Sequence, residues 1–265
     1  SDHPLIVHIG SIEYLEKWAR DIPEYAWTLA KTFWPGPMTL ILKRSQIAKD
    51  FVTGKQKTIG LRVPNNKVAL SLLDSFHEMK GNGLAAPSAN LFSRVSPTSP
   101  LDVEFSIGNR LSNTRDFILD GGNSAIGIES TIINCTNIVP KILRTGKITY
   151  SEIQKICKVE MDVNETNIRF SGSFKKHYSP KAKILLDVLP LEGDGYIGKY
   201  TKQIGVKTPI LLQPINTEEL ARGLYHAFIT ADKLELKRIV ISTQGFKGPL
   251  MEAILDRISK AKYDN

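Results

Sequence analysis

GLAAPSAN, at residues 83–90, is a turn of small and hydroxyl residues that directly follows an apolar run. Such a turn lets backbone N–H groups and the side chains of Ser88 and Asn90 converge on a bound anion. The same pattern is also typical of a plain loop closure or a helix cap. The sequence on either side must therefore decide whether this turn binds a ligand or only shapes the chain.

Three flanking runs are apolar and β-type, and each is interrupted by hydroxyl or cationic residues. They are TIGLRVP at 58–64, IGIESTII at 126–133 and KILRTGKIT at 141–149. Arg62 and Arg144 directly follow apolar residues in these runs. An arginine at such a position is either a surface cation beside a strand end or a ligand-binding residue whose planar guanidinium pairs with a carboxylate or a phosphate.

The composition is that of an ordinary globular protein. The 265 residues are 42% hydrophobic, which suffices to bury the cores of one large and one small domain. The formal net charge of +8 favours anionic partners such as nucleotides or RNA, but lysine-rich solvated surfaces produce the same charge without a partner. Cys135 and Cys157 lack C-x-x-C or Cys/His ligand spacing, so we expect reduced thiols, a cytoplasmic location and no metal site. No apolar stretch approaches the roughly 18 to 20 residues needed to span a bilayer.

Residues 1–159 predict an α+β domain built on a twisted sheet. Strand patterns cover residues 4–9, 38–45, 58–64, 117–119, 128–133 and 140–144. Helices are expected at 11–20, from residue 21 to the Pro-Gly-Pro at 35–37, at 66–80 and at 151–157. Asp21 is expected to cap the second of these, with Glu24 completing a capping box. The third would place its apolar residues on one face, namely Val68, Ala69, Leu72, Leu73 and Phe76.

Residues 160–180 have no sustained periodicity and are predicted to be a linker that lies over a site as a lid. Residues 181–265 alternate strand and helix patterns, with strands expected at 183–188, 209–213 and 238–242 and helices at 217–234 and 249–262. This alternation predicts a small Rossmann-like parallel domain, although no G-x-G-x-x-G accompanies it. The expected fold class is α/β (α+β), a twisted-sheet domain followed by that smaller one.

The chain lacks the motifs of the commonest NTPases, esterases and metalloproteases, namely G-x-x-x-x-G-K-[ST], G-x-S-x-G and H-E-x-x-H. We therefore assign no catalytic nucleophile or acid–base residue. The remaining anion-binding and hydroxyl side chains suit chemistry done by positioning and charge neutralisation. Each has a structural alternative: His8 fits a half-buried core histidine, Ser130 a turn cap and Tyr178 an anchoring aromatic.

Together these stretches resemble the YrdC-like domain of threonylcarbamoyl-AMP synthases. WPGPMTLIL at 34–42, ILDGG at 118–122 and DHPLIVHI at 2–9 add to the resemblance. SGSFKKHYSP at 171–180 is similar to the interdomain segment of the family's two-domain form, which has a Rossmann-like C-terminal domain. The family's first strand, first helix and Lys-x-Arg-Pro segment have no counterpart here, so we expect the chain to be N-terminally incomplete.

The resemblance implies a nucleotidyltransferase that condenses L-threonine, bicarbonate or CO2 and ATP, with Mg2+, into threonylcarbamoyl-AMP and pyrophosphate. It also implies a role in the threonylcarbamoyladenosine modification of tRNA, with a downstream threonylcarbamoyl transferase complex and weak tRNA binding as expected partners. The alternative is a non-catalytic RNA- or nucleotide-binding module, which would leave the set of hydroxyls and arginines unexplained.

The resemblance assigns site residues one by one. For L-threonine it implies His8, Arg62, Ser88 and Ser130. For ATP it implies His3, Thr58, Ala86, Ser96, Arg144 and Tyr178.

Overall fold

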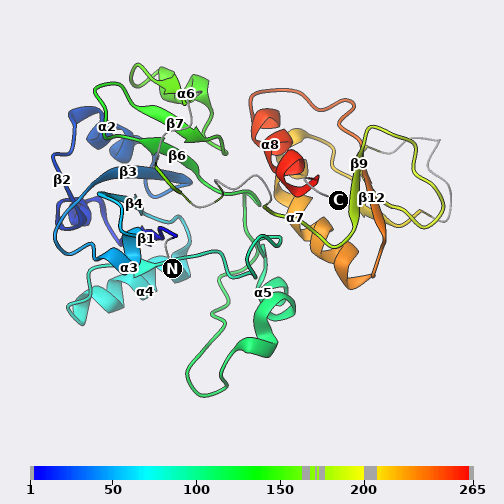
Figure 1. Cartoon of the computed structure of the whole chain (residues 1–265), viewed down its shortest axis with the longest axis horizontal. Coiled ribbons are helices and arrows are strands. Elements are labelled where there is room, and N and C mark those ends of the chain that lie inside the picture. Colours follow the sequence, from blue (N-terminus) through cyan, green and yellow to red (C-terminus); the bar gives the residue numbers. More distant parts are fainter. Residues whose placement is uncertain (1–2, 163–167, 171, 173–176, 200–207, 263–265) are drawn as a thin grey trace. The chain divides into compact units, whose positions relative to one another are not determined.

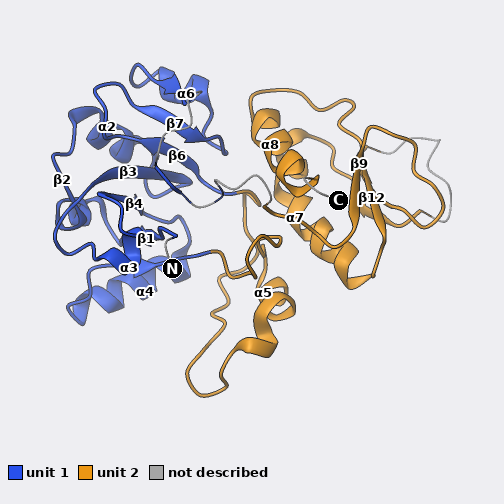
Figure 2. Ribbon diagram, in the orientation of Figure 1, with its two compact units in different colours: residues 1–87, 129–173 blue, residues 88–128, 174–265 orange. Residues whose placement is uncertain are grey.

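The computed structural model describes residues 3–162, 168–170, 172, 177–199 and 208–262 of the chain (Figure 1). Its contacts divide the chain into two compact units, each built from two separate stretches (Figure 2). Unit 1 consists of residues 1–87 and 129–173, and unit 2 of residues 88–128 and 174–265. Much of the predicted linker, at 163–167, 171 and 173–176, lies outside the described residues. The domain limits 1–159, 160–180 and 181–265 stay a prediction.

An eight-stranded mixed sheet forms the centre of unit 1. Its order is β5-β1-β4-β3-β6-β7-β8, and β2 pairs with β3 outside that path. β1 runs parallel to β4 and β3 parallel to β6, whereas β4 is antiparallel to β3 and β6 to β7. The bounds are Ile6–His8 (β1), Ala19–Arg20 (β2), Met38–Arg44 (β3), Thr58–Arg62 (β4), Leu84–Ala85 (β5), Thr131–Asn134 (β6), Lys141–Arg144 (β7) and Glu160–Met161 (β8).

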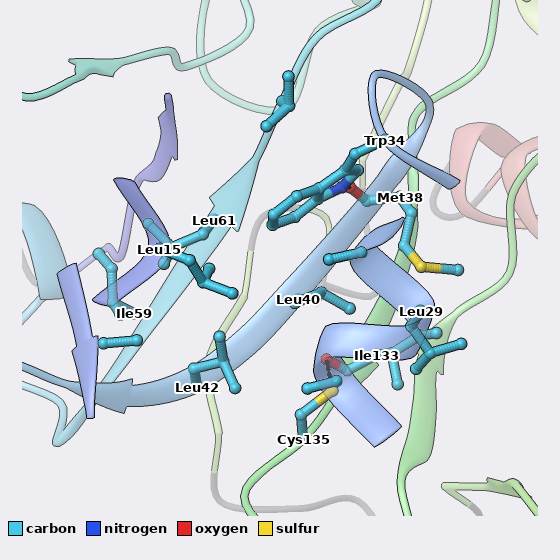
Figure 3. Close-up of a cluster of buried hydrophobic side chains, with 14 of the residues drawn as sticks. Leu15, Leu29, Trp34, Met38, Leu40, Leu42, Ile59, Leu61, Ile133 and Cys135 are labelled. Carbon is cyan, nitrogen blue, oxygen red and sulfur yellow. Dashed lines mark hydrogen bonds between the residues drawn. The ribbon is translucent and has the colours of Figure 1, made fainter. Parts of the chain in front are cut away.

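The core of unit 1 lies on one face of this sheet (Figure 3). Successive side chains of a strand point to opposite faces, so every second residue of β3 and β4 enters the core. Leu40 and Leu42 of β3, together with Ile59 and Leu61 of β4, are at most 1% exposed. Trp34 closes one end of the cluster, and its indole Nε1 donates a hydrogen bond of 2.7 Å to the carbonyl oxygen of Met38.

Short helices complete unit 1: η1 (Ile12–Tyr14), α1 (Leu15–Trp18), α2 (Glu24–Phe33), α3 (Asp50–Thr53), α4 (Lys67–Glu78) and α6 (Tyr150–Gln154). The capping box expected at Asp21 is wrong, because α2 begins at Glu24 with Pro23 as its N-cap residue. Asp21 instead has a φ of 50°, and its carboxylate accepts hydrogen bonds from Arg20 and Lys43. Two cations of the β2–β3 ladder thus compete successfully with the helix for this side chain.

Helix α4 begins where it was predicted to begin, but fewer of its apolar side chains are buried than predicted. The Asn66 side chain accepts a hydrogen bond of 3.0 Å from the backbone N–H of Ala69, which is an N-cap contact. Leu73 is buried, whereas Leu72 of the expected apolar face is 47% exposed. An amphipathic pattern gives the direction of a helix face but not how far that face is covered.

Unit 2 contains a four-stranded parallel sheet of order β11-β10-β12-β9, which confirms the predicted α/β class. The strands are Lys183–Leu186 (β9), Gly195–Ile197 (β10), Ile210–Leu212 (β11) and Arg238–Ile241 (β12), and the long helices are Thr217–Lys233 (α7) and Leu250–Lys262 (α8). β10 was not predicted, because Gly195, Tyr196 and Ile197 form too short a run for a strand pattern. No helix within the described ranges is long and apolar enough to cross a membrane.

The first stretch of unit 2, residues 88–128, contains α5 (Pro100–Ile107) and η2 (Gly108–Arg110). The strand expected at 117–119 is wrong, since these described residues adopt no strand. Phe117 is 87% exposed and Leu119 is 59% exposed. A three-residue apolar run without a neighbouring strand has nothing to pair with, so its β propensity is not realised.

We predict that Leu40→Ala destabilises the protein by about 2 to 5 kcal/mol, because it opens a cavity in the close-packed face of the sheet. Leu72→Ala removes the same atoms from a half-exposed helix position and is expected to cost under about 1 kcal/mol. Urea unfolding of both variants measures the difference. Equal losses in the two would contradict the assignment of the core to this face.

Candidate functional site

The sheet face opposite the core of unit 1 carries polar and charged side chains in a row. His8 of β1 pairs with Arg62 of β4 in the parallel ladder. Thr39 of β3 pairs with Ile132 of β6, which in turn pairs with Arg144 of β7. Paired residues of neighbouring strands point to the same face of a sheet. The polar side chains at the carboxyl ends of β1, β4 and β7 therefore lie on one face, at the same end of the strands.

Arg144 is the most tightly held of these residues. Its side chain is 4% exposed, and Nε and Nη2 donate to the carbonyl oxygen of Ser130 at 3.0 and 2.9 Å. Nη2 also lies 3.2 Å from the Ser130 hydroxyl, which in turn lies 2.7 Å from the hydroxyl of Thr39. Two buried hydroxyls and one guanidinium therefore form a continuous network across β3, β6 and β7.

Arg62 is fixed by the Pro-Gly-Pro turn that precedes β3. Its Nε donates a hydrogen bond of 2.9 Å to the carbonyl oxygen of Gly36, and the Gly36 N–H donates to Val63 at 2.9 Å. A Cβ on Gly36 would lie 2.1 Å from the carbonyl oxygen of Phe33, so no other residue fits without moving the turn. The turn thus requires glycine at position 36, and the carbonyl oxygen of Gly36 orients the guanidinium of Arg62.

The electrostatics of this face favour an anion. Burial and the charge of Arg144 lower the pKa of Arg62 to about 10, so the Arg62 guanidinium is still cationic at neutral pH. Burial and the charge of Arg62 lower the pKa of His8 to about 3, so its imidazole is neutral there. Two guanidiniums, one buried and one partly buried, with a neutral imidazole and two hydroxyls are suited to bind a carboxylate or a phosphate.

Other predicted residues of unit 1 lie at different distances from this row. The Ala86 N–H donates to the carbonyl oxygen of Ile6 at 2.9 Å, so the start of the PSAN turn lies beside β1. Thr58 is at the opposite end of β4 from Arg62, roughly 13 Å along the strand. It lines a cavity of about 10 Å³ with Gly60 and Phe170. His3 is half-buried and precedes β1.

The remaining predicted residues belong to unit 2. Ser88 is exposed and Ser96 is 8% exposed. Tyr178 is 1% exposed, with its ring stacked at 5.3 Å on Tyr225 and 5.7 Å from the Arg257 guanidinium carbon. Of the predicted set, the structure therefore brings together His8, Arg62, Ser130 and Arg144 on unit 1, with Ala86 nearby.

The Asn90 amide nitrogen donates to the carbonyl oxygens of Leu91 and Arg94, at 2.7 and 3.0 Å, and so shapes the turn. These bonds fit the loop-closing alternative for GLAAPSAN. Thr39 was not singled out from the sequence, although a hydroxyl inside the apolar run MTLIL was a signal that could have found it.

Across the described ranges, no group of three or more His, Cys, Asp or Glu side chains is placed to hold a metal ion.

Two protein families match this chain. Residues 1–146 match the Sua5/YciO/YrdC family, described as telomere recombination. Residues 148–262 match the family described as threonylcarbamoyl-AMP synthase, C-terminal domain. Together the matches span almost all of the sequence, and they meet at the end of the KILRTGKIT run.

Individual relatives agree with the family matches. The chain is 33% identical to threonylcarbamoyl-AMP synthase from Pyrococcus abyssi and 32% identical to that from Bacillus subtilis, in each case over 98% of this chain and 80% of the relative. The crystal structure of P. abyssi Sua5 complexed with L-threonine superimposes with a TM-score of 0.85 at 30% identity, over 98% of this chain and 80% of that one. The chain therefore belongs to the Sua5/YciO/YrdC family, in the form that also carries the threonylcarbamoyl-AMP synthase C-terminal domain.

Proposed function

We propose that this chain acts as a threonylcarbamoyl-AMP synthase, which joins L-threonine, bicarbonate or CO2 and ATP into threonylcarbamoyl-AMP and pyrophosphate. The observation that carries the proposal is the polar row of unit 1, in which partly buried Arg62 and buried Arg144 lie with neutral His8 and the hydroxyls of Ser130 and Thr39. Relatives of the same name, and the threonine complex of the P. abyssi protein, favour this enzyme over a non-catalytic RNA- or nucleotide-binding module.

Arg62 is the residue proposed to pair with the carboxylate of threonine. Its planar guanidinium is anchored through Nε on Gly36, so the other nitrogens can bind both oxygens of a carboxylate. His8, Ser88 and Ser130 complete the proposed threonine set. The neutral imidazole of His8 and the serine hydroxyls are suited to the polar groups of threonine, because they add hydrogen bonds without adding charge.

Arg144 is proposed to face the phosphates of ATP. It is held by Ser130 at two nitrogens, so it is already oriented before the nucleotide binds. The other residues proposed for ATP are His3, Thr58, Ala86, Ser96 and Tyr178. Tyr178 is packed in the core of unit 2, so any contact of its ring with nucleotide requires that packing to change.

The proposed reaction needs positioning more than acid–base catalysis. The threonine nitrogen bonds to the carbon of CO2 and loses a proton, which gives N-carboxythreonine. A carboxylate oxygen of that group then attacks the α-phosphorus of ATP, the bond to the bridging oxygen breaks, and pyrophosphate leaves with the electron pair. Arg62 would hold the amino acid by its original carboxylate, and Arg144 would stabilise the negative charge that develops on the phosphates.

Magnesium is proposed to enter with ATP and to neutralise its phosphates. The donors of the row are cations and hydroxyls, which suit phosphate oxygens rather than a resident metal. We further propose a cytoplasmic location, where free thiols such as Cys135 stay reduced. A threonylcarbamoyl transferase acting on tRNA is the proposed consumer of the product, with weak tRNA binding by this chain.

The direct test is release of pyrophosphate from ATP by the purified full-length protein. Pyrophosphate and AMP-linked product are expected only when L-threonine and bicarbonate are both present, since the attacking carboxylate contains both. Mass spectrometry identifies the adenylate. Pyrophosphate release that ignores threonine, or nucleotide binding without turnover, would reject the synthase in favour of the binding module.

We predict that Arg62→Ala weakens threonine binding by about 2 to 5 kcal/mol, or roughly 30-fold or more, because the substrate carboxylate loses its charged partner. ATP binding is expected to change by only a few-fold. Calorimetric titration with each ligand measures both effects. Arg20→Ala is the matched control, since its guanidinium is on the same unit and 61% exposed. Equal losses for threonine and ATP would contradict the role given to Arg62.

We predict that the His8 imidazole does not titrate between pH 5 and 8, because burial and Arg62 lower its pKa to about 3. In the unfolded chain this group titrates near 6.5. Between about pH 6.5 and 3 the unfolded state therefore binds a proton that the native state does not bind. His8 therefore lowers stability progressively as pH falls from about 6.5 towards 3. The stability of the wild type relative to His8→Gln should fall over that range, by up to about 1.4 kcal/mol per pH unit. A His8 C2-proton NMR signal that moves with a midpoint near 6.5 would disprove the assignment.

A further inference from the structure

Residues 88–128, which carry the proposed substrate contacts Ser88 and Ser96, pack within unit 2. Val95 is 3% exposed and Ile128 is 8% exposed, and both belong to the hydrophobic cluster that α7 and α8 help to build. The segment is thus held near both of its ends by the carboxyl-terminal part of the chain. Three further sets of contacts show how closely it is held.

The first contact is between Gly127 and the backbone of α7. Gly127 has a φ of +82°, a conformation that favours glycine. A Cβ at this position would lie 2.3 Å from the carbonyl oxygen of Arg222 and 2.6 Å from that of Ala221. Since a helix backbone cannot give way as a flexible side chain can, α7 determines the path by which the segment returns to β6.

The second contact is a buried carboxylate on α5. Asp102 is 0% exposed, and its Oδ2 lies 3.2 Å from Nδ1 of His226 while its Oδ1 accepts from Nζ of Lys233 at 3.3 Å. His226 and Lys233 are seven residues apart, so they lie on the same face of α7. Lys233 Nζ also lies 5.1 Å from the ring centre of Phe105, a second residue of α5. Side chains from two successive turns of α7 therefore contact Asp102 of α5, and the contact from Lys233 is an ion pair.

Burial raises the pKa of Asp102, but the hydrogen bond and charge of His226, with the bonds from Ser99 and Lys233, bring it below its ordinary value. The carboxylate is thus ionised at neutral pH. A buried carboxylate that lost these donors would be left with an uncompensated charge, and the segment around it would have to rearrange to hydrate it.

The third set of contacts joins these anchors to the two serines. Thr98 donates to Asp102 from its hydroxyl at 3.2 Å, so Ser96 lies between that anchor and buried Val95. On the amino-terminal side of Ser96, the carbonyl oxygen of Ser93 accepts a hydrogen bond of 3.0 Å from the Ser179 N–H. Asn90 bonds to the carbonyl oxygen of Arg94, and its own N–H donates to Ser88 at 2.8 Å. Short-range contacts thus link the anchored residues to Ser96 and Ser88.

We propose that helix α7 positions the substrate-binding segment, with His226 and Lys233 acting through Asp102 as positioning residues for Ser96 and Ser88. Neither residue is proposed to touch a substrate. This inference rests on the proposed function, in which Ser88 contacts threonine and Ser96 contacts ATP. It gives the carboxyl-terminal part of the chain a role in substrate affinity that is separate from any covering of the site by the linker.

The test compares the wild-type protein with the double variant His226→Ala/Lys233→Met. We expect KM for ATP and for threonine to rise at least five-fold while kcat changes less than three-fold, because the serines remain but are no longer held in place. Hydrogen–deuterium exchange of residues 93–107 should accelerate, with exchange in β3 and β4 unchanged. Lys237→Met is the matched control, because Lys237 is exposed and lies outside α7. It should leave KM and exchange unaltered.

Lys233→Arg is the conservative counterpart of Lys233→Met, because it keeps a cationic donor beside Asp102. Its KM for each substrate should stay within two-fold of the wild-type value. A purely structural role would lower the melting temperature without changing KM in the folded protein, and that outcome overturns the inference. Should the double variant not fold, Lys233→Met alone carries the same comparison. A wild-type protein that makes no threonylcarbamoyl-AMP would reject the proposed function, whereas active wild type with unchanged KM in the variants would reject this inference only.

Discussion

The two-residue period of β4 is the constraint on which unit 1 depends. Ile59 and Leu61 point into the core, and Thr58, Gly60 and Arg62 point to the opposite face. A register slip of one residue would move a guanidinium into the hydrophobic cluster and expose two large apolar side chains. The same alternation in β3 puts Leu40 on the core side and Thr39 on the polar side. The hydrophobic core therefore fixes the register that aligns the polar row.

Once that register is fixed, the polar face holds like charges that are costly to keep from water. The lowered pKa of Arg62 reflects both its burial and the charge of Arg144. Backbone carbonyls of Gly36 and Ser130 compensate part of this cost, since each accepts from a guanidinium. A bound anion would compensate much of the rest, so ligand binding and folding stability are expected to be coupled. The cost of these charges therefore favours ligands that carry a carboxylate or a phosphate.

Local patterns predicted the parts of the fold that local interactions decide. Periodicity was enough to predict the strands at 38–44 and 58–62, the long helix of unit 2 and the helix that starts after Asn66. The failures involve partners distant in sequence. Asp21 bonds to Lys43, which is 22 residues away, as well as to its neighbour Arg20. The packing of residues 88–128 against α7 depends on the Asp102–His226 contact, which joins residues 124 apart. No window of sequence contains both members of such a pair.

The candidate site shows the same division. His8, Arg62, Ser130 and Arg144 stand in or beside recognisable strands. Only the family resemblance singled them out as site residues, because the strand pattern alone left their structural alternatives open. Thr39 stands out in the sequence only as a hydroxyl inside an apolar run, and the pairing of β3 with β6 is what places it beside that network. For Asn90 the sequence left anion binding and loop closure open, and the bonds of its amide to nearby carbonyl oxygens fit loop closure.

The interleaving of the two units also constrains the order in which the chain can fold. Residues 88–128 leave the ribosome long before α7, the helix they pack against, has been made. Unit 1 can close around this stretch once residue 144 has emerged and β6 and β7 can pair, and at that point the stretch is an extruded loop with no core of its own. Its apolar residues Val95 and Ile128 must wait for the last third of the chain. The nascent protein therefore passes through a stage in which most of unit 1 can fold while the shorter stretch of unit 2 is exposed to chaperones and proteases.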